Sequence, residues 1–382
     1  MSSQKENSKR IAYLVTEDWY FCSHRLPLGV SAKQLGYLVD VVTRFSRDRD
    51  QIVSAGLGDV ESPIRRTRMG PLGELQSIWR LYQLYRKGRY NIVHQVGMKP
   101  VVYGSLCVLG CPQTRVVNAL GGLGFVFTSN DLRARLIRPL LGLALRWLIN
   151  GSNGKLILQN PDDIEYLVQR LHVDPKKIVL IRGAGVDMET FQPRATAVDK
   201  PLVMLASRML WNKGVGDFVE AAKRLIANKV QARFVLVGGL DEDNPLCIPE
   251  AQLRAWQEEG IEWWGNRTDM ANVLASASIV ALPTTYGEGV PKVLIEAASC
   301  AKPIIATNVA GCREIVRDGE TGILVKPRDI DAIANAIAAL LSDPAKAGQM
   351  GMNGRALVQR EFTEASVIAR TMEVYEEVTS GE

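Results

Sequence analysis

The chain has 382 residues, 47% of them apolar and 23% charged, and a formal net charge of +5. These values are typical of a globular protein with two domains, and the charge is too small for this length to indicate a nucleic-acid-binding protein. The six cysteines have no CxxC spacing, which indicates reduced thiols rather than a disulfide framework or a zinc site. The polar start, MSSQKENSKR, leads directly into a strand pattern, so we expect no signal peptide and a cytoplasmic location.

The first half of the chain alternates apolar strands with helices. Strands are expected at 10–16, 37–43 and 91–96. Ser23 as an N-cap and Gly36 beyond the last turn predict a helix between the first two strands. Strands that are apolar throughout indicate buried parallel sheets, because helices then cover both faces.

The same pattern restarts after residue 200 and predicts a second sheet. The expected strands are 201–208, 232–239, 277–283 and 302–308, and the expected helices include 214–229 and 329–343. Between the halves the chain is polar and contains proline, which is typical of a linker. We therefore expect an α/β protein with domains at 1–187 and 201–364, a hinge at 188–200, and a C-terminal helix at 365–382 that can return to the first domain.

Two cations follow the first strand of the second half. Two hinged sheet domains predict a cleft, and ligands of parallel sheets bind beyond the carboxyl ends of the strands. Arg208 and Lys213 lie at such an end, close to the start of a helix, which suits a diphosphate. Ordinary surface charges would give the same pattern, so the sequence leaves both interpretations open at this point.

The stretch YGEGVPKVLIEAASCAKP holds two glutamates eight residues apart, Glu288 and Glu296. Pro291 favours the first position of a helix, which puts Glu288 in the preceding loop and Glu296 in the second turn. A carboxylate among apolar neighbours is costly to bury without donors, and the hydroxyl groups of a ribose would supply them. Glu288 could accept hydrogen bonds from a second polyol. The alternative is a helix with one solvent-facing glutamate, although its apolar neighbours leave little room for an exposed stripe.

The segment DLRARLIRPLLGLALRWLIN, residues 131–150, combines arginines with leucines. Arg135, Arg138 and Arg146 fall on one helical stripe, and leucines and Trp147 occupy much of the rest. The segment is too charged to span a bilayer, but basic amphipathic helices with tryptophan often lie in the membrane interface. The alternative is a helix packed on its sheet with a solvated arginine face.

Taken together, these segments resemble family 4 of the retaining glycosyltransferases, over nearly the whole chain. The pair Glu288 and Glu296 matches the E-x7-E motif of that family, and LASRMLWNKG matches its R-x4-K segment. RGAGVDMETF is similar to its hinge signature and NVAGCREIVRDGETGILV to its post-motif segment. EDWYFCSHRLPL and GGLGFVF resemble a bacterial branch that acts on surface polysaccharides. The resemblance implies the GT-B fold, in which two Rossmann-like parallel-sheet domains face each other across a cleft.

The resemblance also implies roles for single residues. Arg208 and Lys213 would hold the donor diphosphate, Glu296 the nucleotide ribose, and Glu288 the donor sugar. The other implied donor-binding positions, of which 265–267 would lie beside the base, are Gly238, Gly265, Asn266, Arg267, Gly289, Val290, Lys292 and Val293.

The first domain departs from the family pattern. Many members carry two histidines after the strand equivalent to NIVHQV, but here only His94 is present, followed by Lys99 as a substitute cation. Both are candidates for a catalytic role near the sugar, and a buried structural role for His94 stays open. In place of the usual Gly-Gly turn, the chain has Glu17, Asp18 and His24, which we expect at the acceptor edge of the cleft.

The function implied is transfer of a hexosyl or N-acetylhexosaminyl group, with retention, from a nucleotide-diphosphate sugar (a UDP-sugar) to a polyprenyl-diphosphate-linked glycan. Such an enzyme would build bacterial surface polysaccharide, lipopolysaccharide or O-antigen as a peripheral protein at the inner face of the cytoplasmic membrane, with no metal or other cofactor. Asp241 and Asp243 resemble the metal-binding DxD of another glycosyltransferase fold, but that fold has one domain. The alternatives are a sugar-nucleotide epimerase, a phosphorylase, a glycosyltransferase with a soluble acceptor, and a non-enzymatic sugar-binding protein.

Overall fold

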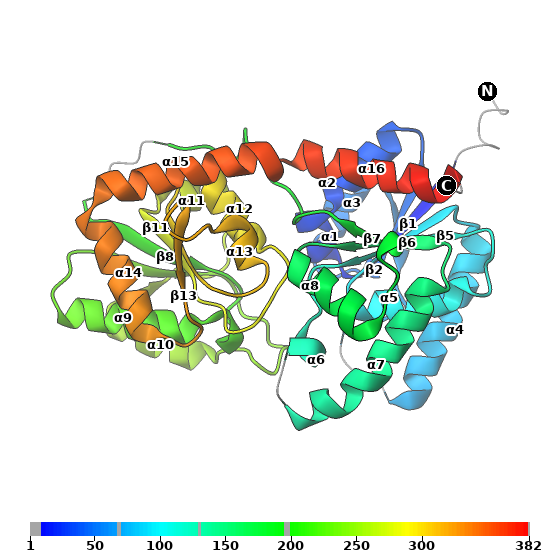
Figure 1. The fold of residues 1–382 in the computed structure, drawn as a ribbon, viewed down its shortest axis with the longest axis horizontal. Helices are drawn as coiled ribbons and strands as arrows, with labels where there is room; N and C mark the ends of the chain where they lie inside the picture. The colour runs from blue at the N-terminus through cyan, green and yellow to red at the C-terminus, as the bar shows by residue number, and fades with distance from the viewer. Residues whose placement is uncertain (1–8, 67–69, 129–130, 195–198, 381–382) are drawn as a thin grey trace. The chain divides into compact units, whose positions relative to one another are not determined.

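The computed structural model describes residues 9–66, 70–128, 131–194 and 199–380, and the chain divides into two compact units (Figure 1). Unit 1 contains residues 1–184 and 364–382, and unit 2 contains 185–363. The chain therefore changes unit at 184–185 and again at 363–364, and not along the predicted hinge of 188–200. The last helix, α16 (Glu364–Ser380), belongs to unit 1.

Unit 1 is built on a seven-stranded parallel sheet with the order β3-β2-β1-β4-β5-β6-β7. Its strands are β1 (Arg10–Glu17), β2 (Leu38–Arg44), β3 (Gly58–Glu61), β4 (Ile92–Val96), β5 (Arg115–Leu120), β6 (Gly154–Leu158) and β7 (Ile178–Leu180). Every residue of the central strand β4 is buried, as expected for a parallel strand covered on both faces. The strand order reverses between β1 and β4.

Helices cover both faces of this sheet (Figure 1). On one face lie α1 (Asp18–His24), α2 (Leu26–Gln34) and α16, and on the other lie α4 (Pro71–Gly88), α5 (Met98–Val108) and α7 (Leu132–Asn150). Side chains alternate along a strand, so Tyr13 of β1 joins the first layer and Leu14 the second. Shorter elements of unit 1 are α3 (Arg49–Ser54), α6 (Phe125–Thr128), α8 (Pro161–Glu165), a π-helical turn (Tyr166–Arg170) and a 3-10 turn (Pro175–Lys177).

The helix predicted from Ser23 is two helices. Ser23 lies inside α1, which begins directly after β1 at Asp18. The chain leaves helical geometry at Arg25, and α2 starts at Leu26 with Pro27 in its first turn. Proline lacks the N–H that a continuing helix needs, so Pro27 favours a new start over a continuation of α1.

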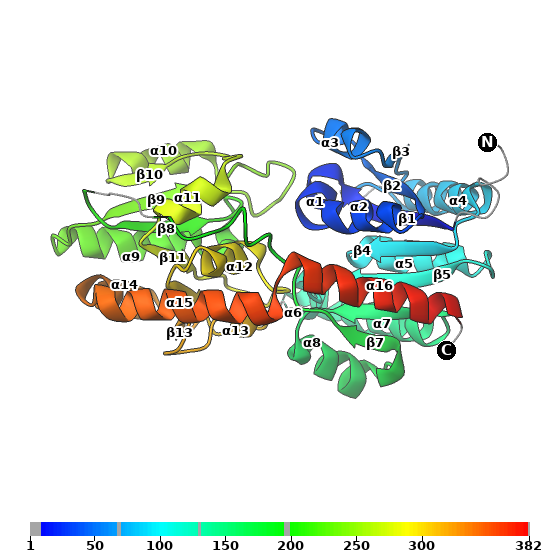
Figure 2. The same ribbon diagram turned by 90° about the horizontal axis from the view of Figure 1, so that it is seen from above.

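Unit 2 holds a six-stranded parallel sheet with the order β10-β9-β8-β11-β12-β13. Its strands are β8 (Leu202–Ala206), β9 (Arg233–Val237), β10 (Ile261–Trp263), β11 (Ile279–Leu282), β12 (Ile304–Thr307) and β13 (Gly322–Val325). From β8 the chain moves outward through β9 to β10, and then returns to the other side of β8 as β11. The carboxyl ends of β8 and β11 are therefore neighbours where the strand order reverses, as the strand labels of Figure 2 show.

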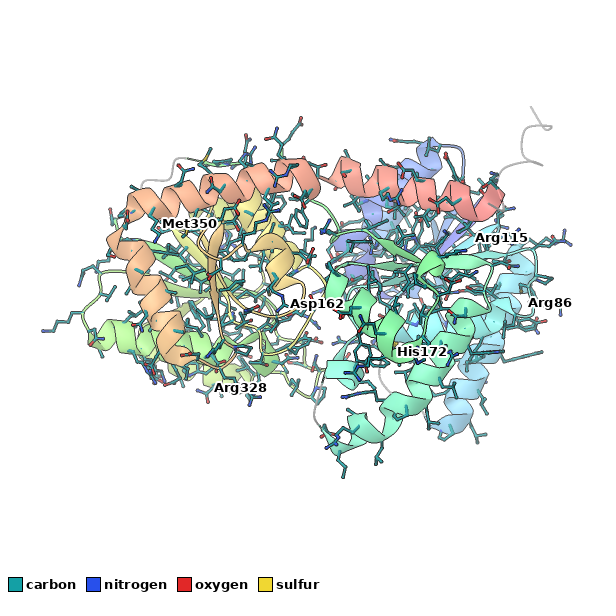
Figure 3. The ribbon with its side chains drawn as sticks, viewed as in Figure 1. Arg86, Arg115, Asp162, His172, Arg328 and Met350 are labelled. Carbon is teal, nitrogen blue, oxygen red and sulfur yellow. The ribbon has the colours of Figure 1, made fainter. Side chains whose placement is uncertain are left out.

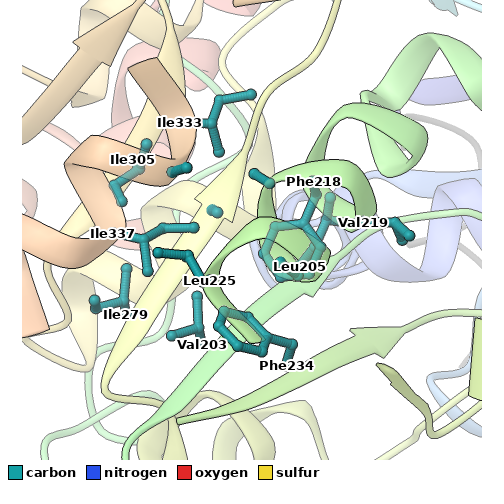
Figure 4. Packing of buried hydrophobic residues seen from close by; sticks show 14 of the residues in the cluster. Val203, Leu205, Phe218, Val219, Leu225, Phe234, Ile279, Ile305, Ile333 and Ile337 are labelled. Carbon is teal, nitrogen blue, oxygen red and sulfur yellow. The ribbon is translucent and has the colours of Figure 1, made fainter. Parts of the chain in front are cut away.

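Two helix layers enclose the second sheet. The helices α9 (Val215–Ala227) and α14 (Ile330–Ser342) pack on one face, and α11 (Met270–Ser276), α12 (Lys292–Ser299) and α15 (Pro344–Glu361) on the other. Figure 4 shows the first layer, in which Phe218 of α9 and Ile337 of α14 lie against Val203 of β8. The remaining helices are α10 (Glu250–Glu258), α13 (Cys312–Ile315) and the 3-10 turn Trp211–Lys213. The predicted fold class, two Rossmann-like parallel-sheet domains, is confirmed.

Candidate active site

The predicted donor residues lie on loops at the carboxyl edge of the unit 2 sheet. One loop follows β8 and carries Arg208 and Lys213, and the other follows β11 and carries Glu288. The two loops are joined through the carbonyl oxygen of Asn212, which accepts from the Thr285 N–H at 3.0 Å and from the Thr284 hydroxyl at 3.1 Å. The strand-reversal point and these bonds bring together residues about 75 positions apart in sequence.

Gly214 allows the close approach of these loops. It has φ of +74° and caps α9 directly after Lys213. A Cβ atom at this position would lie 1.9 Å from the Pro283 carbonyl oxygen, so any other residue would push the loops apart. Lys213 is thus the last residue of the 3-10 turn, and Gly214 alone separates it from α9.

Lys213 and Glu288 form a largely enclosed ion pair. Their side chains are only 11% and 14% exposed, and the second Glu288 oxygen accepts from the Thr284 hydroxyl at 2.8 Å. The Lys213 ammonium also lies 5.6 Å from the ring centre of Tyr286. Burial is the largest influence and opposes the lysine charge, but Glu288 and Tyr286 together outweigh it and raise the pKa of Lys213, with the Arg208 guanidinium acting in the opposite direction. Lys213 is therefore a cation at neutral pH.

The Glu288 loop is positioned by the segment after β12. Gly311 has φ of +82°, and a Cβ there would lie 2.1 Å from the Gly289 carbonyl oxygen. The Glu288 N–H donates to the Ala310 carbonyl at 3.3 Å, and Val290 is buried. Gly311 lies in the segment NVAGCRE, which carried the family resemblance but received no site role. Its signal in the sequence is a glycine in the short loop between a strand and a helix.

Arg208 is paired with the first carboxylate of the DxD sequence. Its guanidinium donates to Asp241 Oδ2 at 2.5 Å, and Asp241 follows β9, the neighbouring strand. Asp241 is mostly buried, whereas the Arg208 side chain is 38% exposed. Among the described residues, no group of three or more His, Cys, Asp and Glu side chains is arranged to hold a metal ion. In the sequence Asp241 belongs to a DxD-like pattern, which gives no sign of its contact with Arg208.

Glu296 is buried in α12, as its apolar neighbours predicted. Only 8% of the residue is exposed, and burial raises the pKa of its carboxyl, while the Lys292 ammonium 3.3 Å from Oε1 opposes that rise. The helix begins at Lys292, with Pro291 as its N-cap, one residue later than predicted. Val293 lies in the first turn and packs at the edge of the adjacent core.

The predicted base-binding segment follows β10. Gly238 approaches β8 so closely that a Cβ would lie 1.7 Å from the Ser207 carbonyl oxygen, and its N–H donates to the Gly265 carbonyl at 2.8 Å. Asn266 lies beside Gly239. Arg267 makes two bonds of 2.8 Å to Asp269. These residues belong to the same sheet edge as Arg208, on the next two strands of the row.

His94 lies in the core of unit 1. It is fully buried on β4, and its Nδ1 is 2.6 Å from the hydroxyl of Tyr375 on α16, which in turn donates to the Tyr13 hydroxyl at 3.0 Å. Burial lowers the pKa of His94 well below its ordinary value, so the ring is neutral. Lys99 binds Glu74 at 2.9 Å and the Arg65 carbonyl at 2.8 Å. The contacts of His94 and of Lys99 are structural, and a catalytic role for either residue stays a prediction.

Asp18 organises a loop of unit 1. It is fully buried, and one of its oxygens accepts from the backbone N–H groups of Ser46, Arg47 and Asp48 at 2.8–2.9 Å. Burial alone would raise its pKa, but these bonds and the Ser46 hydroxyl lower it to about 2. Asp18 therefore holds the chain after β2.

The other two residues predicted at this edge are Glu17 and His24. Glu17 is buried at the end of β1. The His24 ring stacks on Tyr20 with centroids 4.1 Å apart.

The three α7 arginines are not equivalent. Arg135 and Arg146 are exposed, whereas Arg138 is half-buried and its Nε donates to the Val126 carbonyl at 2.9 Å. Arg138 thus holds α6 against α7. Trp147 is 58% exposed. Of the three basic side chains in the predicted stripe, Arg135 and Arg146 point to solvent, and Arg138 is bound to the protein.

Comparisons with known proteins show the family and the fold. Residues 10–157 match the family model described as glycosyl transferase 4-like, and residues 200–343 match the one described as glycosyl transferases group 1. Solved structures with the same fold include a sucrose-phosphate synthase from Thermosynechococcus elongatus (TM-score 0.81, 21% identity, 98% of this chain and 100% of that one). Anabaena HepE in complex with UDP is a further one (TM-score 0.76, 17% identity, 97% and 100%). The protein is a glycosyltransferase of the GT-B fold.

Two relatives are more informative than the fold. An N,N'-diacetylbacillosaminyl-diphospho-undecaprenol alpha-1,3-N-acetylgalactosaminyltransferase from Campylobacter jejuni is 24% identical over 97% of this chain and 99% of its own length. A UDP-Gal:alpha-D-GlcNAc-diphosphoundecaprenol alpha-1,3-galactosyltransferase from Escherichia coli is 29% identical over 71% of each chain. The chain belongs to the family 4 glycosyltransferases, as its motifs predicted, and the name of the Escherichia coli relative specifies a UDP-sugar donor.

Proposed function

We propose that this enzyme moves a hexosyl or N-acetylhexosaminyl group from a UDP-sugar to a polyprenyl-diphosphate-linked glycan, with retention of the anomeric configuration. The product would be an intermediate of a bacterial surface polysaccharide such as an O-antigen or lipopolysaccharide. One observation carries the proposal: Arg208, Lys213 and Glu288 share the sheet edge at the strand-reversal point of unit 2, where doubly wound sheets bind ligands.

The two cations suit the leaving group of this reaction. As the bond between the anomeric carbon and the phosphate oxygen breaks, negative charge develops on the diphosphate, and preorganised cations stabilise it. In the structure Arg208 and Lys213 are each paired with a carboxylate, those of Asp241 and Glu288. A bound diphosphate would take over both cations, and Glu288 would then be available to accept hydrogen bonds from sugar hydroxyl groups.

The acceptor would attack on the face that the leaving group vacates. Its hydroxyl oxygen bonds to the anomeric carbon, the carbon–oxygen bond to the diphosphate breaks, and the hydroxyl proton passes to the departing phosphate oxygen. This course gives retention and requires no protein nucleophile. Glu296, buried on α12 with a raised pKa, would bind the ribose hydroxyl groups, which supply the donors that a buried carboxylate needs.

We infer that the reaction requires no metal ion. Arg208 and Lys213 supply positive charge where a divalent cation would otherwise be needed, and Asp241 binds Arg208. Activity is therefore expected to persist in EDTA. Complete loss under chelation, with recovery on adding magnesium or manganese, would contradict this part of the proposal.

The proposed acceptor class comes from the two relatives, whose names specify undecaprenyl-diphosphate-linked substrates. Such a substrate is anchored in lipid, so we propose that the enzyme works as a peripheral protein at the inner face of the cytoplasmic membrane. None of the described helices combines the length and the apolar character needed to cross a bilayer.

The experiment is a donor panel with a defined acceptor. The purified enzyme is incubated with UDP-, GDP- and dTDP-sugars and short polyprenyl-diphosphate saccharides, and UDP release and the mass of the lipid product are measured. We expect one UDP-sugar to extend the acceptor by one residue, and the anomeric coupling of the product to show retention. Transfer only from another nucleotide would refute the donor, inversion would refute the mechanism, and isomerised sugar nucleotide without transfer would indicate an epimerase.

A further inference from the structure

Helix α7 exposes an apolar stripe. Its outward side chains, spaced three or four residues apart, are Leu132, Leu136, Leu140, Leu143 and Trp147, with exposed fractions between 58% and 72%. This spacing places them on one face of the helix. Leu145, Leu148 and Ile149 are buried against the rest of unit 1. The helix is therefore apolar toward solvent as well as toward the core, unlike an ordinary surface helix, whose outer face is polar.

Helix α4 exposes a second apolar group. Leu72, Leu75 and Trp79 are 83%, 63% and 59% exposed and lie one helical turn apart. Both α4 and α7 lie beside α5 on the same face of the sheet, as Figures 1 and 2 show. We call the eight side chains of these two groups the leucine–tryptophan surface. Exposed apolar patches of this kind mark interaction sites.

The exposed charges of these two helices have one sign. From Leu132 to Asn150 α7 contains no acidic residue, and Arg135 and Arg146 flank its apolar stripe. In α4 the exposed charges are Arg80, Arg86 and Lys87, and Figure 3 shows Arg86 projecting from the molecule. The single acidic residue of α4 is Glu74, which is paired with Lys99. Apolar side chains flanked by cations complement a lipid surface with anionic headgroups.

We propose that the leucine–tryptophan surface inserts into the boundary between headgroups and acyl chains of an anionic bilayer and holds unit 1 on the membrane. The inference rests on the proposed function, because a lipid-linked acceptor gives the enzyme a reason to bind there. It assigns the main contact to leucine and tryptophan side chains on two helices, and a secondary role to Arg135 and Arg146. A second copy of the chain fits less well, since an isologous contact would bring cations of the same sign together.

The test compares three variants with the parent protein in sedimentation with vesicles of phosphatidylcholine and phosphatidylglycerol. The apolar variant is Leu136→Gln/Leu140→Gln/Trp147→Gln, and the basic variant is Arg135→Gln/Arg146→Gln. The matched control is Leu35→Gln, a leucine that is 65% exposed at the end of α2 on the opposite helix layer. Circular dichroism and thermal melting check that all four proteins are folded.

The parent is expected to bind these vesicles and to keep part of its binding in high salt, because salt screens only the arginine contribution. The apolar variant should bind at least tenfold more weakly at every salt concentration. The basic variant should weaken only at low salt, and Leu35→Gln should equal the parent. Brominated lipid should quench the fluorescence of Trp79 and Trp147, and Trp79→Phe/Trp147→Phe should abolish that quenching.

Failure of this inference is distinguishable from failure of the proposed function. All proteins are also assayed with a short water-soluble acceptor analogue, for which the apolar variant should keep the parent rate. If transfer occurs but the parent does not bind vesicles, or the apolar variant binds as the parent does, the membrane surface is refuted. A concentration-dependent dimer that the apolar variant loses, without vesicle binding, would refute it in favour of a second copy. Absence of transfer to any acceptor would refute the proposed function alone.

Discussion

The candidate polar residues of the two units are held in different ways. In unit 2, Lys213 and Arg208 are each bound to a side-chain carboxylate from another loop. In unit 1, Asp18 is bound by backbone N–H groups and His94 by a tyrosine from the last helix. A side-chain carboxylate can be exchanged for a ligand phosphate without unfolding a loop. Loss of the bonds to backbone donors or to a core tyrosine would instead disrupt the loop or the core. The position of a polar residue in the sheet is thus insufficient to define a ligand site. Whether the residue can bind a ligand depends on the partner that already holds it.

The most direct test of this difference is to remove the two cations whose carboxylate partners can be exchanged. Lys213→Ala and Arg208→Ala should each lower kcat by about 100-fold or more, because each removes a preorganised donor to the leaving diphosphate. Initial rates of UDP release measure the effect. Arg233→Ala is the matched control, since Arg233 forms an exposed pair with Glu262 at the start of β9, and it should keep the parent rate. Near-normal rates in both site variants, with folding intact, would show that the diphosphate binds elsewhere.

His94 tests the other half of the comparison. His94→Ala should lower the free energy of unfolding by about 3 kcal/mol, because it leaves a cavity in the core and deprives the Tyr375 hydroxyl of its partner. Urea unfolding gives this value, and kcat of the folded fraction should change by less than about tenfold. A loss of about 100-fold in kcat at unchanged stability would instead identify His94 as a catalytic group.

Asp241 sharpens the assignment of Arg208. Asp241→Asn keeps the shape of the side chain but removes its charge, so Arg208 loses a competing partner and keeps the diphosphate. We expect kcat/KM to change by less than about tenfold, and added magnesium or manganese to leave the variant unaffected. Asp243→Asn is the companion variant, with a similarly small effect expected. Rescue of an inactive Asp241→Asn enzyme by a divalent cation would indicate metal chemistry instead.

The last prediction concerns pH and Asp18. The pKa of Asp18 is lowered to about 2 in the folded protein from its usual 3.8. Its bonds therefore stabilise the fold fully at pH values above the pKa of the unfolded state. This stabilisation is lost as the pH falls from the unfolded pKa to the folded pKa. A shift of this size corresponds to about 2 kcal/mol at neutral pH. Asp18→Asn should therefore be less stable than the parent at neutral pH, and the difference should shrink as the pH falls from about 4 toward 2. A difference independent of pH would mean that the backbone bonds do not depend on the carboxylate charge.

Both sheets are predictable from the sequence, because a parallel strand is buried on both faces and is therefore apolar throughout. The burial of Glu296 is predictable too, since apolar residues surround that glutamate in the chain. The ion pair between Arg208 and Asp241 could not be predicted from the sequence, because the two residues are 33 positions apart and meet only through the conformation of their loops. The start of α1 was missed for a related reason: Asp18 begins a helix directly at a strand end, and its bonds to residues 46–48 are not visible in local sequence.

The same limit explains the apolar face of α7. Its sequence places leucines and arginines around the helix. Whether the leucine or the arginine side chains point to solvent depends on how the helix packs on its sheet. The structure exposes Leu136 and Leu140 and binds Arg138 to the protein. The prediction of a basic membrane-binding stripe therefore becomes a proposal about apolar side chains.

The placement of α16 has a consequence for biosynthesis. Tyr375 is fully buried in unit 1 and contacts His94, 281 residues earlier in the chain, and Tyr13, 362 residues earlier. Unit 2 is thus an insertion within unit 1, and the ribosome makes all of it before the last piece of the unit 1 core is available. Unit 2, which is continuous, can fold while translation proceeds, whereas unit 1 must wait with an unfilled core. A nascent chain that stops before residue 364 would therefore present chaperones and proteases with an N-terminal sheet whose α16 face is uncovered.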